Sequence, residues 1–321
     1  MNHASAHQLS INSDFIYHPE DGMEISLDGI EAVSQYESNG KLIKPELFFN
    51  GSIVRYNGRL FYACRADQRP WWDKIRVVGC ELDSNYTPIN DTVRFLGLSA
   101  DKDWHHVEDP RLFVHNGRLM IAYTDGFKMY SSELDESMNV IKNNGVMSGL
   151  HVRTANSVKR EKNWSPFSIG KDLYFTYSAA PHVVIAPDGD VIMSNYGVQW
   201  DYGQVRGGTP AIRYGDNEFI TFFHSSLVID DHQTQFSQRV YYMGAYTFSA
   251  NAQFKPLKMT ATPLMKGVIS RSNKPRPTSA LVVFPVGVVE ESDHFVVSYG
   301  YNYITTRVIR ISKPLLTKVL Q

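Results

Sequence analysis

One turn-and-strand phrase recurs five times along this chain of 321 residues, and it constrains the fold more than any other feature. Each copy starts with a polar turn and leads into a strand-like run of five or six residues, with an aromatic residue or cysteine near its end. The copies read NGRLFYACR (57–65), NGRLMIAYT (116–124), GKDLYFTYS (170–178), DNEFITFFH (216–224) and SDHFVVSYG (292–300). Short runs of alternating apolar and polar residues between recurring turns indicate antiparallel strands along the chain, and the repeated phrase predicts one equivalent strand in each of five units.

The spacing of the copies identifies the kind of unit. They start at residues 57, 116, 170, 216 and 292, which is too far apart for a solenoid repeat but fits one sheet per copy with uneven loops. Helical patterns are scarce, and LLTKVL at 315–320 is the best candidate. We therefore predict an all-β fold, a five-bladed β-propeller with a central polar pocket, in preference to a sandwich or a barrel.

The ends of the repeated strands suggest where that pocket lies. Equivalent blades would place five small or polar residues at similar heights around the axis, although strand ends can also simply face solvent. These residues are Arg65, Thr124, Ser178, His224 and Gly300. We expect one propeller domain over residues 1–321, with an N-terminal extension (1–40), five blades (about 41–312) and a tail (313–321). The extension could close the last blade, cover the pocket or mediate association.

Composition excludes several classes of partner. The formal net charge is −1 and basic residues are scattered, so nothing favours nucleic acid or an anionic membrane surface. Cys64 and Cys80 have neither CxxC nor zinc-type spacing and are expected to be reduced core thiols. The N-terminus lacks a signal-peptide pattern, and no apolar run approaches the roughly 20 residues that span a bilayer. We expect a cytoplasmic protein without a membrane span, and association into a homo-oligomer stays open.

The run DWHHVEDPRLF at 103–113 is the main candidate for chemistry. Pro110 biases Asp109 toward an extended backbone, so Arg111 should point to the same side as Asp109. Glu108 should point to the other side, where it could brace backbone or arginine groups. Because Asp-Pro also begins ordinary turns, this stretch alone does not separate a proton donor from a turn residue.

Other catalytic patterns find little support. His105 and His106 are adjacent and would point to opposite faces of a strand, and no spaced ligand set completes a metal site. No G-x-S-x-G elbow occurs, and RGGTPA at 206–211 lacks the Lys-Ser/Thr of a phosphate-binding loop. We therefore expect neither a metal nor an organic cofactor.

Tryptophans give a first indication of the substrate. Of Trp71, Trp72, Trp104 and Trp164, three lie beside charged motifs. Sugar sites commonly combine aromatic rings, on which the apolar face of the sugar stacks, with polar groups for the hydroxyls. Core packing explains any single tryptophan as well, but the grouping favours a carbohydrate.

The order of the motifs resembles a known family. FNGSIVRYNGRLFYACRAD is followed by EDPRLF, RGGTPAI, FITFFHSS, YYMGAYTF, VVFPVGVV and VVSYGY, from about residue 47 to about residue 301. This series resembles the inverting β-mannoside phosphorylases and β-1,2-mannosidases, which are five-bladed propellers, and the related propeller mannosyltransferases.

The resemblance implies roles for individual residues. Asp109 is the implied general acid, and in the phosphorylases its proton is thought to pass through a sugar hydroxyl. The implied or expected substrate-binding residues are Asn50, Ser52, Arg65, Asp67, Arg111, Trp164 and Asn302. The implied or expected phosphate- or anion-binding residues are Lys162, His182, Arg206, His224 and Tyr241, with Arg153 as a further candidate cation. Cations and hydroxyls suit an anionic nucleophile or leaving group.

Three motifs depart from the family pattern. The chain has EKNWSPF at 161–167, and YSAAPH at 177–182, where an expected phosphate-contacting arginine is absent or replaced by His182. It also has YGYNY at 299–303, with Asn302 near the place of a missing aspartate. These changes favour transfer slightly over phosphorolysis or hydrolysis, and the glutamate pair that would activate water cannot be placed. The predicted function is mannosyl transfer with inversion, with phosphate, mannose 1-phosphate or a nucleotide sugar as co-substrate and an oligosaccharide or sugar phosphate as substrate. A β-mannoside hydrolase and a non-catalytic glycan-binding propeller are the alternatives.

Overall fold

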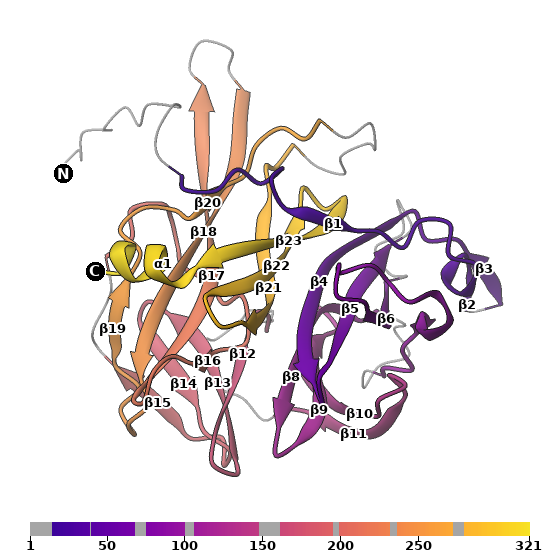
Figure 1. The fold of residues 1–321 in the computed structure, drawn as a ribbon, viewed down its shortest axis with the longest axis horizontal. Coiled ribbons are helices and arrows are strands. Elements are labelled where there is room, and N and C mark those ends of the chain that lie inside the picture. The colour runs from indigo at the N-terminus through magenta and orange to yellow at the C-terminus, as the bar shows by residue number, and fades with distance from the viewer. Residues whose placement is uncertain are drawn as a thin grey trace, which may run out of the picture.

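Five antiparallel sheets surround a common axis in the part of the chain that the structure describes (Figure 1). The structure is a computed structural model. It describes residues 15–38, 40–67, 75–99, 106–147, 161–194, 199–231, 236–271 and 279–321. The predicted all-β five-bladed propeller is confirmed.

Each blade begins with the strand nearest the axis, and the chain then moves outward. Blade I contains β4 (Leu47–Tyr56), β5 (Arg59–Asp67), β6 (Arg76–Leu82) and β7 (Arg94–Phe95). Blade II contains β8 (Glu108–His115), β9 (Arg118–Thr124), β10 (Met129–Leu134) and β11 (Val140–Val146). Blade III contains β12 (Ser165–Ile169), β13 (Asp172–Ala179), β14 (His182–Ile185) and β15 (Val191–Ser194).

The last two blades differ in detail. Blade IV contains β16 (Ile212–Arg213), β17 (Glu218–Asp231), β18 (Phe236–Ser249), β19 (Pro256–Met259) and β20 (Met265–Lys266). Blade V contains β21 (Val283–Glu290), β22 (His294–Tyr301), β23 (Thr305–Ser312) and β1 (Met23–Ile25). Outside the blades lie β2 (Tyr36–Ser38), β3 (Lys41–Ile43), two 3-10 turns (Glu31–Val33 and Asn90–Thr92) and α1 (Lys313–Val319). The strands β17 and β18 extend beyond the other blades at the top of Figure 1.

The repeated phrase corresponds to the second strand of every blade: β5, β9, β13, β17 and β22. The strand before it faces the axis, where β4 packs against β8 of one neighbouring blade and β21 of the other. In blades I and II the second strand is buried along almost its whole length, between two strands of its own sheet and between neighbouring blades, which explains its nearly continuous apolar run.

An N-terminal strand completes the ring. β1 pairs antiparallel with β23, with Met23 opposite Val308 and Ile25 opposite Thr306. The Tyr299 hydroxyl also donates a 2.6 Å hydrogen bond to the carbonyl of Pro19. Part of the N-terminal extension therefore forms the outer strand of blade V, so that the two ends of the chain are joined in one sheet.

Apolar side chains fill the spaces between blades. Leu119 and Tyr123 of blade II pack with Val54 and Phe61 of blade I in one such cluster. Cys64 is buried and not disulfide-bonded, like Cys80, and burial raises the pKa of its thiol to about 12. Among the described residues, no helix is long and apolar enough to cross a membrane.

Candidate active site

A bulge in the first strand of blade II determines how Asp109 is presented. Glu108 lies opposite Thr124, but Arg111 lies opposite Ala122, so β8 contains one residue more than its partner strand. Asp109 has φ 53°, in the left-handed region. The expectation of an extended Asp109 was therefore wrong: the bulge absorbs an extra residue, and aspartate tolerates the left-handed conformation better than most side chains.

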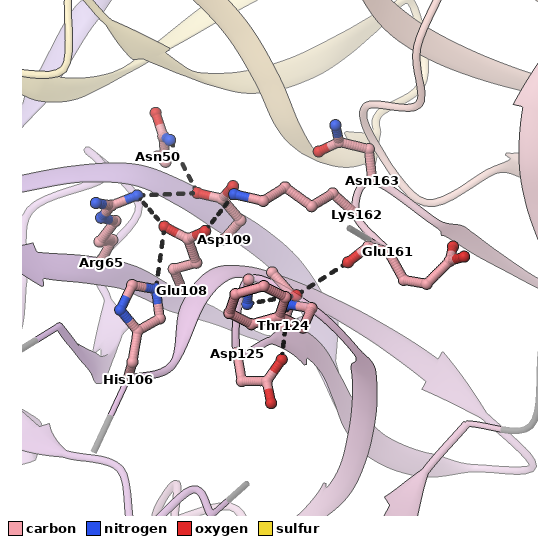
Figure 2. A network of polar contacts seen from close by, with 12 residues as sticks. Asn50, Arg65, His106, Glu108, Asp109, Thr124, Asp125, Glu161, Lys162 and Asn163 are labelled. Atoms are coloured by element: carbon pink, nitrogen blue, oxygen red, sulfur yellow. Dashed lines mark hydrogen bonds and ion pairs between the residues drawn. The ribbon is translucent and has the colours of Figure 1, made fainter. Parts of the chain in front are cut away.

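The first strand of blade I has a matching bulge. Phe49 lies opposite Arg65 and Ser52 opposite Ala63, and Asn50 has φ 51°. The two bulges bring Asn50 and Asp109 together, and Asn50 Nδ2 donates a 3.0 Å hydrogen bond to Asp109 Oδ1 (Figure 2). Two left-handed non-glycine residues at adjacent strands are a costly arrangement of the kind that clusters at functional sites.

Arg65 is the central cation of a group of charged side chains that we call the charged cluster: Arg65, Asp67, Glu108, Asp109 and Lys162. It ion-pairs with Glu108, and it lies 3.4 Å from Asp67 Oδ2 and 3.9 Å from Asp109 Oδ1. Its guanidinium also stacks over the Phe49 ring, with 5.0 Å to the ring centroid. Burial opposes its charge, but the three carboxylates outweigh burial and raise the pKa of Arg65.

Glu108 is held as a carboxylate by three bases. Besides Arg65, it accepts a 2.5 Å bond from Lys162 Nζ and lies 3.5 Å from His106 Nε2. Burial alone would raise the pKa of Glu108, but Arg65, His106 and Lys162 lower it well below its usual range. Its oxygens are therefore already bound within the protein, which fits a bracing role.

Arg111 lies behind Asp109 and is completely buried. Its Nη1 donates to the carbonyl of Asp109 at 3.2 Å, its Nε to the carbonyl of Gly208 at 2.7 Å, and its Nη2 to Asn163 Oδ1 at 3.1 Å. Burial lowers its pKa to about 10, so the group stays charged at neutral pH. Arg111 therefore fastens the Asp109 backbone to the blade III and IV segments.

Aromatic residues pack beside Arg65 and Arg111, and we refer to Phe49, His224, Tyr241, Phe284 and Tyr303 as the aromatic wall. The His224 ring lies parallel to the Tyr241 ring, with 5.9 Å between the ring centroids, and edge-on to the Phe284 ring, with 4.6 Å between the centroids. The Tyr241 and Tyr303 hydroxyls are 3.4 Å apart, and Tyr303 packs edge-on against Phe49 at 5.8 Å. The wall connects to the charged cluster through Phe49 and Arg65.

His224 is a neutral member of the wall. Its Nδ1 donates a 2.8 Å bond to the carbonyl of Gly207, and burial lowers its pKa to about 3. Arg206, which pairs with His224 through the backbone, has an exposed side chain. Of these two candidate anion contacts, only Arg206 carries a positive charge at neutral pH.

Two residues expected from the sequence are packed in apolar surroundings. Trp164 is 2% exposed among Met129, Phe175 and Ile185, and its indole nitrogen donates to Glu161 Oε2 at 3.2 Å. His182 packs against the rings of Tyr246 and Phe248, and burial lowers its pKa to about 4. A buried neutral imidazole does not supply the cation expected of His182. Trp71, Trp72, Trp104, His105 and Arg153 lie outside the described residues.

Ser52 and Asn302 hold backbone near the site. The Ser52 hydroxyl accepts a 2.9 Å bond from the Leu112 amide. Asn302 accepts from the Val282 amide at 2.7 Å and donates to the carbonyl of Val268 at 2.9 Å. Both predicted substrate-binding side chains are therefore occupied by the protein itself.

The sequence analysis missed part of the site. Tyr303, Phe284 and Asn163 were not proposed, although YGYNY contains Tyr303 and the motif EKNWSPF contains Asn163. A hairpin turn with Asn302 and Tyr303 at its centre was the available signal. Within the described ranges, no group of three or more His, Cys, Asp or Glu side chains is arranged to hold a metal ion.

Comparison with known proteins agrees with this arrangement. Residues 26–318 match the sequence profile of glycoside hydrolase family 130, described as β-1,4-mannooligosaccharide phosphorylase. The chain belongs to this family. The resemblance of its motifs to β-mannoside phosphorylases is therefore confirmed, and with it an enzyme of a family that cleaves or forms β-mannosidic bonds. A search of curated proteins found no match.

Solved structures share the fold at low sequence identity. A glycosyl hydrolase from Bacteroides ovatus is 14% identical with a TM-score of 0.64, covering 91% of this chain and 94% of that one. A β-1,2-mannobiose phosphorylase from Listeria innocua, solved with β-1,2-mannobiose, is 16% identical with a TM-score of 0.55, covering 89% and 98%. A mannose phosphorylase from Leishmania mexicana, solved with phosphate, is 13% identical with a TM-score of 0.55, covering 92% and 89%.

Proposed function

We propose that this family 130 enzyme transfers a mannosyl unit between a β-mannoside and phosphate, with inversion at the anomeric carbon and with Asp109 as the acid/base. The observation that carries the proposal is the unequal exposure of the clustered carboxylates. The side chain of Asp109 is 11% exposed, whereas those of Glu108 and Asp67 are 5% and 1% exposed and lie against Arg65. Asp109 is the carboxylate best able to meet a substrate.

The number of available carboxylates supports phosphate as the nucleophile. Hydrolysis with inversion needs a second carboxylate to activate water across the sugar ring. Among the described residues around Asp109, Asp67 and Glu108 lie against Arg65, and Glu161 accepts bonds from Trp164 and Tyr177. Phosphate brings its own nucleophilic oxygen, so that phosphorolysis requires the acid alone.

The proposed reaction balances as a single displacement. A phosphate oxygen attacks the anomeric carbon from the face opposite the leaving group, and the glycosidic bond breaks. The proton of Asp109 goes to the glycosidic oxygen, which leaves a sugar hydroxyl and α-mannose 1-phosphate. In the reverse direction Asp109 accepts the proton of the acceptor hydroxyl, so one site carries out both cleavage and synthesis. Asn50 and Arg111 hold Asp109 in position.

Phosphate requires cations, and among the described residues Lys162 and Arg206 are the two candidates with partly or fully exposed side chains. Lys162 is half-buried and gives one bond to Glu108, so its ammonium keeps further donors. Arg206 is exposed beside His224. We propose these two as the phosphate contacts, with Tyr241 and neutral His224 as uncharged neighbours. The reaction then needs no metal or organic cofactor.

Hydrolysis is the second candidate, because the charges near Asp109 are already balanced within the protein. Glu108 pairs with both Arg65 and Lys162, and His224 is neutral. This pairing weakens the attraction for an incoming anion, which water does not need.

A donor and acceptor screen tests the proposal. The chain is incubated with β-1,2- and β-1,4-mannobiose with and without inorganic phosphate, and with mannose 1-phosphate or GDP-mannose plus mannose. We expect α-mannose 1-phosphate only when phosphate is present, and mannoside synthesis from mannose 1-phosphate. Phosphate-independent release of mannose would establish hydrolysis instead. Transfer from GDP-mannose alone would assign a nucleotide-sugar donor, and no conversion of any donor would overturn the catalytic proposal.

A further inference from the structure

The turn between β22 and β23 has an unusual residue at its second central position. Ile304 donates its amide to the carbonyl of Tyr301 at 2.9 Å, which closes a turn with Asn302 and Tyr303 at its centre. Their φ angles are 52° and 56°, as in the hairpin turns that favour Asn-Gly. Asparagine suits its position, but a bulky tyrosine with positive φ is an outlier that costs free energy.

The surroundings keep Tyr303 in this conformation. Asn302 is 1% exposed, and its side chain bonds both to the Val282 amide and to the Val268 carbonyl, which fixes the first half of the turn. The Tyr303 ring then packs edge-on against Phe49 of blade I. The strained turn therefore delivers one aromatic ring from blade V to the aromatic wall.

Tyr303 stands next to the charged cluster. Phe49 contacts both the Tyr303 ring and the Arg65 guanidinium, and Arg65 lies 3.9 Å from Asp109 Oδ1. Burial first, and then the neighbouring Tyr241 and Asp109, raise the pKa of Tyr303 well above its ordinary value. The hydroxyl consequently stays protonated and can donate.

The pair of hydroxyls has the hydrogen-bonding character of a sugar contact. Tyr241 and Tyr303 lie 3.4 Å apart, and two phenols that share one hydrogen bond keep one donor and several acceptor lone pairs. A sugar hydroxyl donates and accepts, so it complements this pair without requiring charge.

We propose that Tyr303, together with Tyr241, binds a hydroxyl of the mannosyl unit beside Asp109 and so contributes to the choice of sugar. This assignment rests on the proposed function for the identity of the ligand. The strain at Tyr303 is then the cost of placing a specific hydroxyl donor on the wall.

The substitution Tyr303→Phe tests the assignment, because it keeps the ring on Phe49 and removes only the hydroxyl. Losing one neutral hydrogen bond should lower kcat/KM on β-mannobiose roughly 5- to 10-fold. The matched control is Tyr301→Phe, two residues earlier in the same hairpin, whose hydroxyl bonds to Glu20 at 3.3 Å. The control should keep wild-type kcat/KM, and both variants should keep the wild-type Tm within a few degrees.

Deoxy substrates separate a direct contact from a structural role. A series of β-mannosides, each lacking one hydroxyl of the transferred mannose, is assayed with the wild type and with Tyr303→Phe. For one member the wild type should lose the same 5- to 10-fold, and Tyr303→Phe should lose nothing further. Equal additional losses in Tyr303→Phe for every member would refute the contact.

Binding keeps the two proposals distinguishable. If the wild type binds β-mannobiose in calorimetry but converts no donor, the proposed function fails, and a 5- to 10-fold weaker Kd for Tyr303→Phe would still support the contact. If the wild type is active and Tyr303→Phe matches it in kcat/KM and Kd, the inference on Tyr303 is overturned. It is also overturned if the wild type shows no binding of β-mannobiose.

Discussion

The charged cluster of blades I and II and the His182 region of blade III bury ionisable groups in opposite ways. Arg65 is surrounded by three carboxylates and keeps its charge. His182 is enclosed by the rings of Tyr246 and Phe248 and is neutral at pH 7. Both were expected to bind substrate or phosphate, and both are almost completely buried.

The difference teaches that the charged partners of a buried group, and not its burial or its position in a blade, distinguish the candidate active site from the apolar core. A buried charge is retained only when opposite charges and hydrogen bonds compensate for lost hydration. The bulges of β4 and β8 bring these partners together, whereas the register shift of β13 near Ser178 brings no charged partner to His182 among the described residues.

The largest expected effect concerns stability. Arg65→Leu leaves buried carboxylates without their common cation and should lower the free energy of unfolding by about 3–5 kcal/mol. His182→Leu replaces a neutral ring in an apolar site and should lower the free energy of unfolding by about 1 kcal/mol or less. Denaturant unfolding at pH 7 measures both, and equal costs would abolish the distinction between the two regions.

The two regions should also lose stability at different pH. The folded pKa of His182, about 4, lies below the ordinary value near 6.5, so protonation favours the unfolded chain as the pH falls through this interval. Lowering the pH from 7 to 5 should therefore reduce the free energy of unfolding by about 2 kcal/mol through His182 alone. The pKa of Glu108 is lowered by its cations, so its contribution is present above the ordinary carboxyl pKa and is lost only below about pH 4.3.

Unfolding of the wild type and of His182→Leu at pH 7 and pH 5 checks this assignment. The free energy of unfolding should decline less from pH 7 to pH 5 in the variant than in the wild type. Part of the decline remains in the variant, because His224, with a pKa of about 3, contributes in the same direction. An identical decline in both proteins would mean that His182 is not the neutral buried group described above.

The smallest effect concerns the contact between the bulges. A Cβ at Gly300 would lie 1.9 Å from Asn50 Oδ1, so Gly300→Ala must displace Asn50 from Asp109. We expect about 1 kcal/mol of lost stability and a measurable drop in turnover. Gly97→Ala is the control, since a Cβ at Gly97 meets no described atom within 4 Å. Unchanged turnover in Gly300→Ala would show that the Asn50–Asp109 bond is dispensable.

Much of the fold was accessible from the sequence because the repeat records a repeated environment. The second strands of blades I and II are both buried, so NGRLFYACR and NGRLMIAYT show the same polar turn followed by an apolar run. For the N-terminal extension, completing the last blade was only one of three alternatives, since the three residues of β1 are too few to show a recognisable strand pattern in the sequence.

The site was harder to predict because its geometry depends on exceptions to regular structure. The bias that Pro110 imposes on the residue before it wrongly predicted an extended Asp109, since a bulge is determined by the partner strand. Trp164 and His182 stand in suggestive motifs, but neighbouring aromatic rings enclose them. Tyr303 was missed because the backbone conformation of its turn, which no sequence motif records, brings its ring to the aromatic wall.

The role of Asp109 as proton donor is tested most directly by comparing two leaving groups in one variant. Asp109→Asn keeps the shape of the side chain but removes the proton donor, and it should lower kcat on β-mannobiose by about 10²–10⁴-fold. With a dinitrophenyl β-mannoside, whose leaving group needs no proton, the loss should be far smaller. Asp135→Asn, in an exposed turn of blade II, is the control and should match the wild type on both donors. Equal losses on both donors, or wild-type turnover of β-mannobiose by Asp109→Asn, would contradict the assignment.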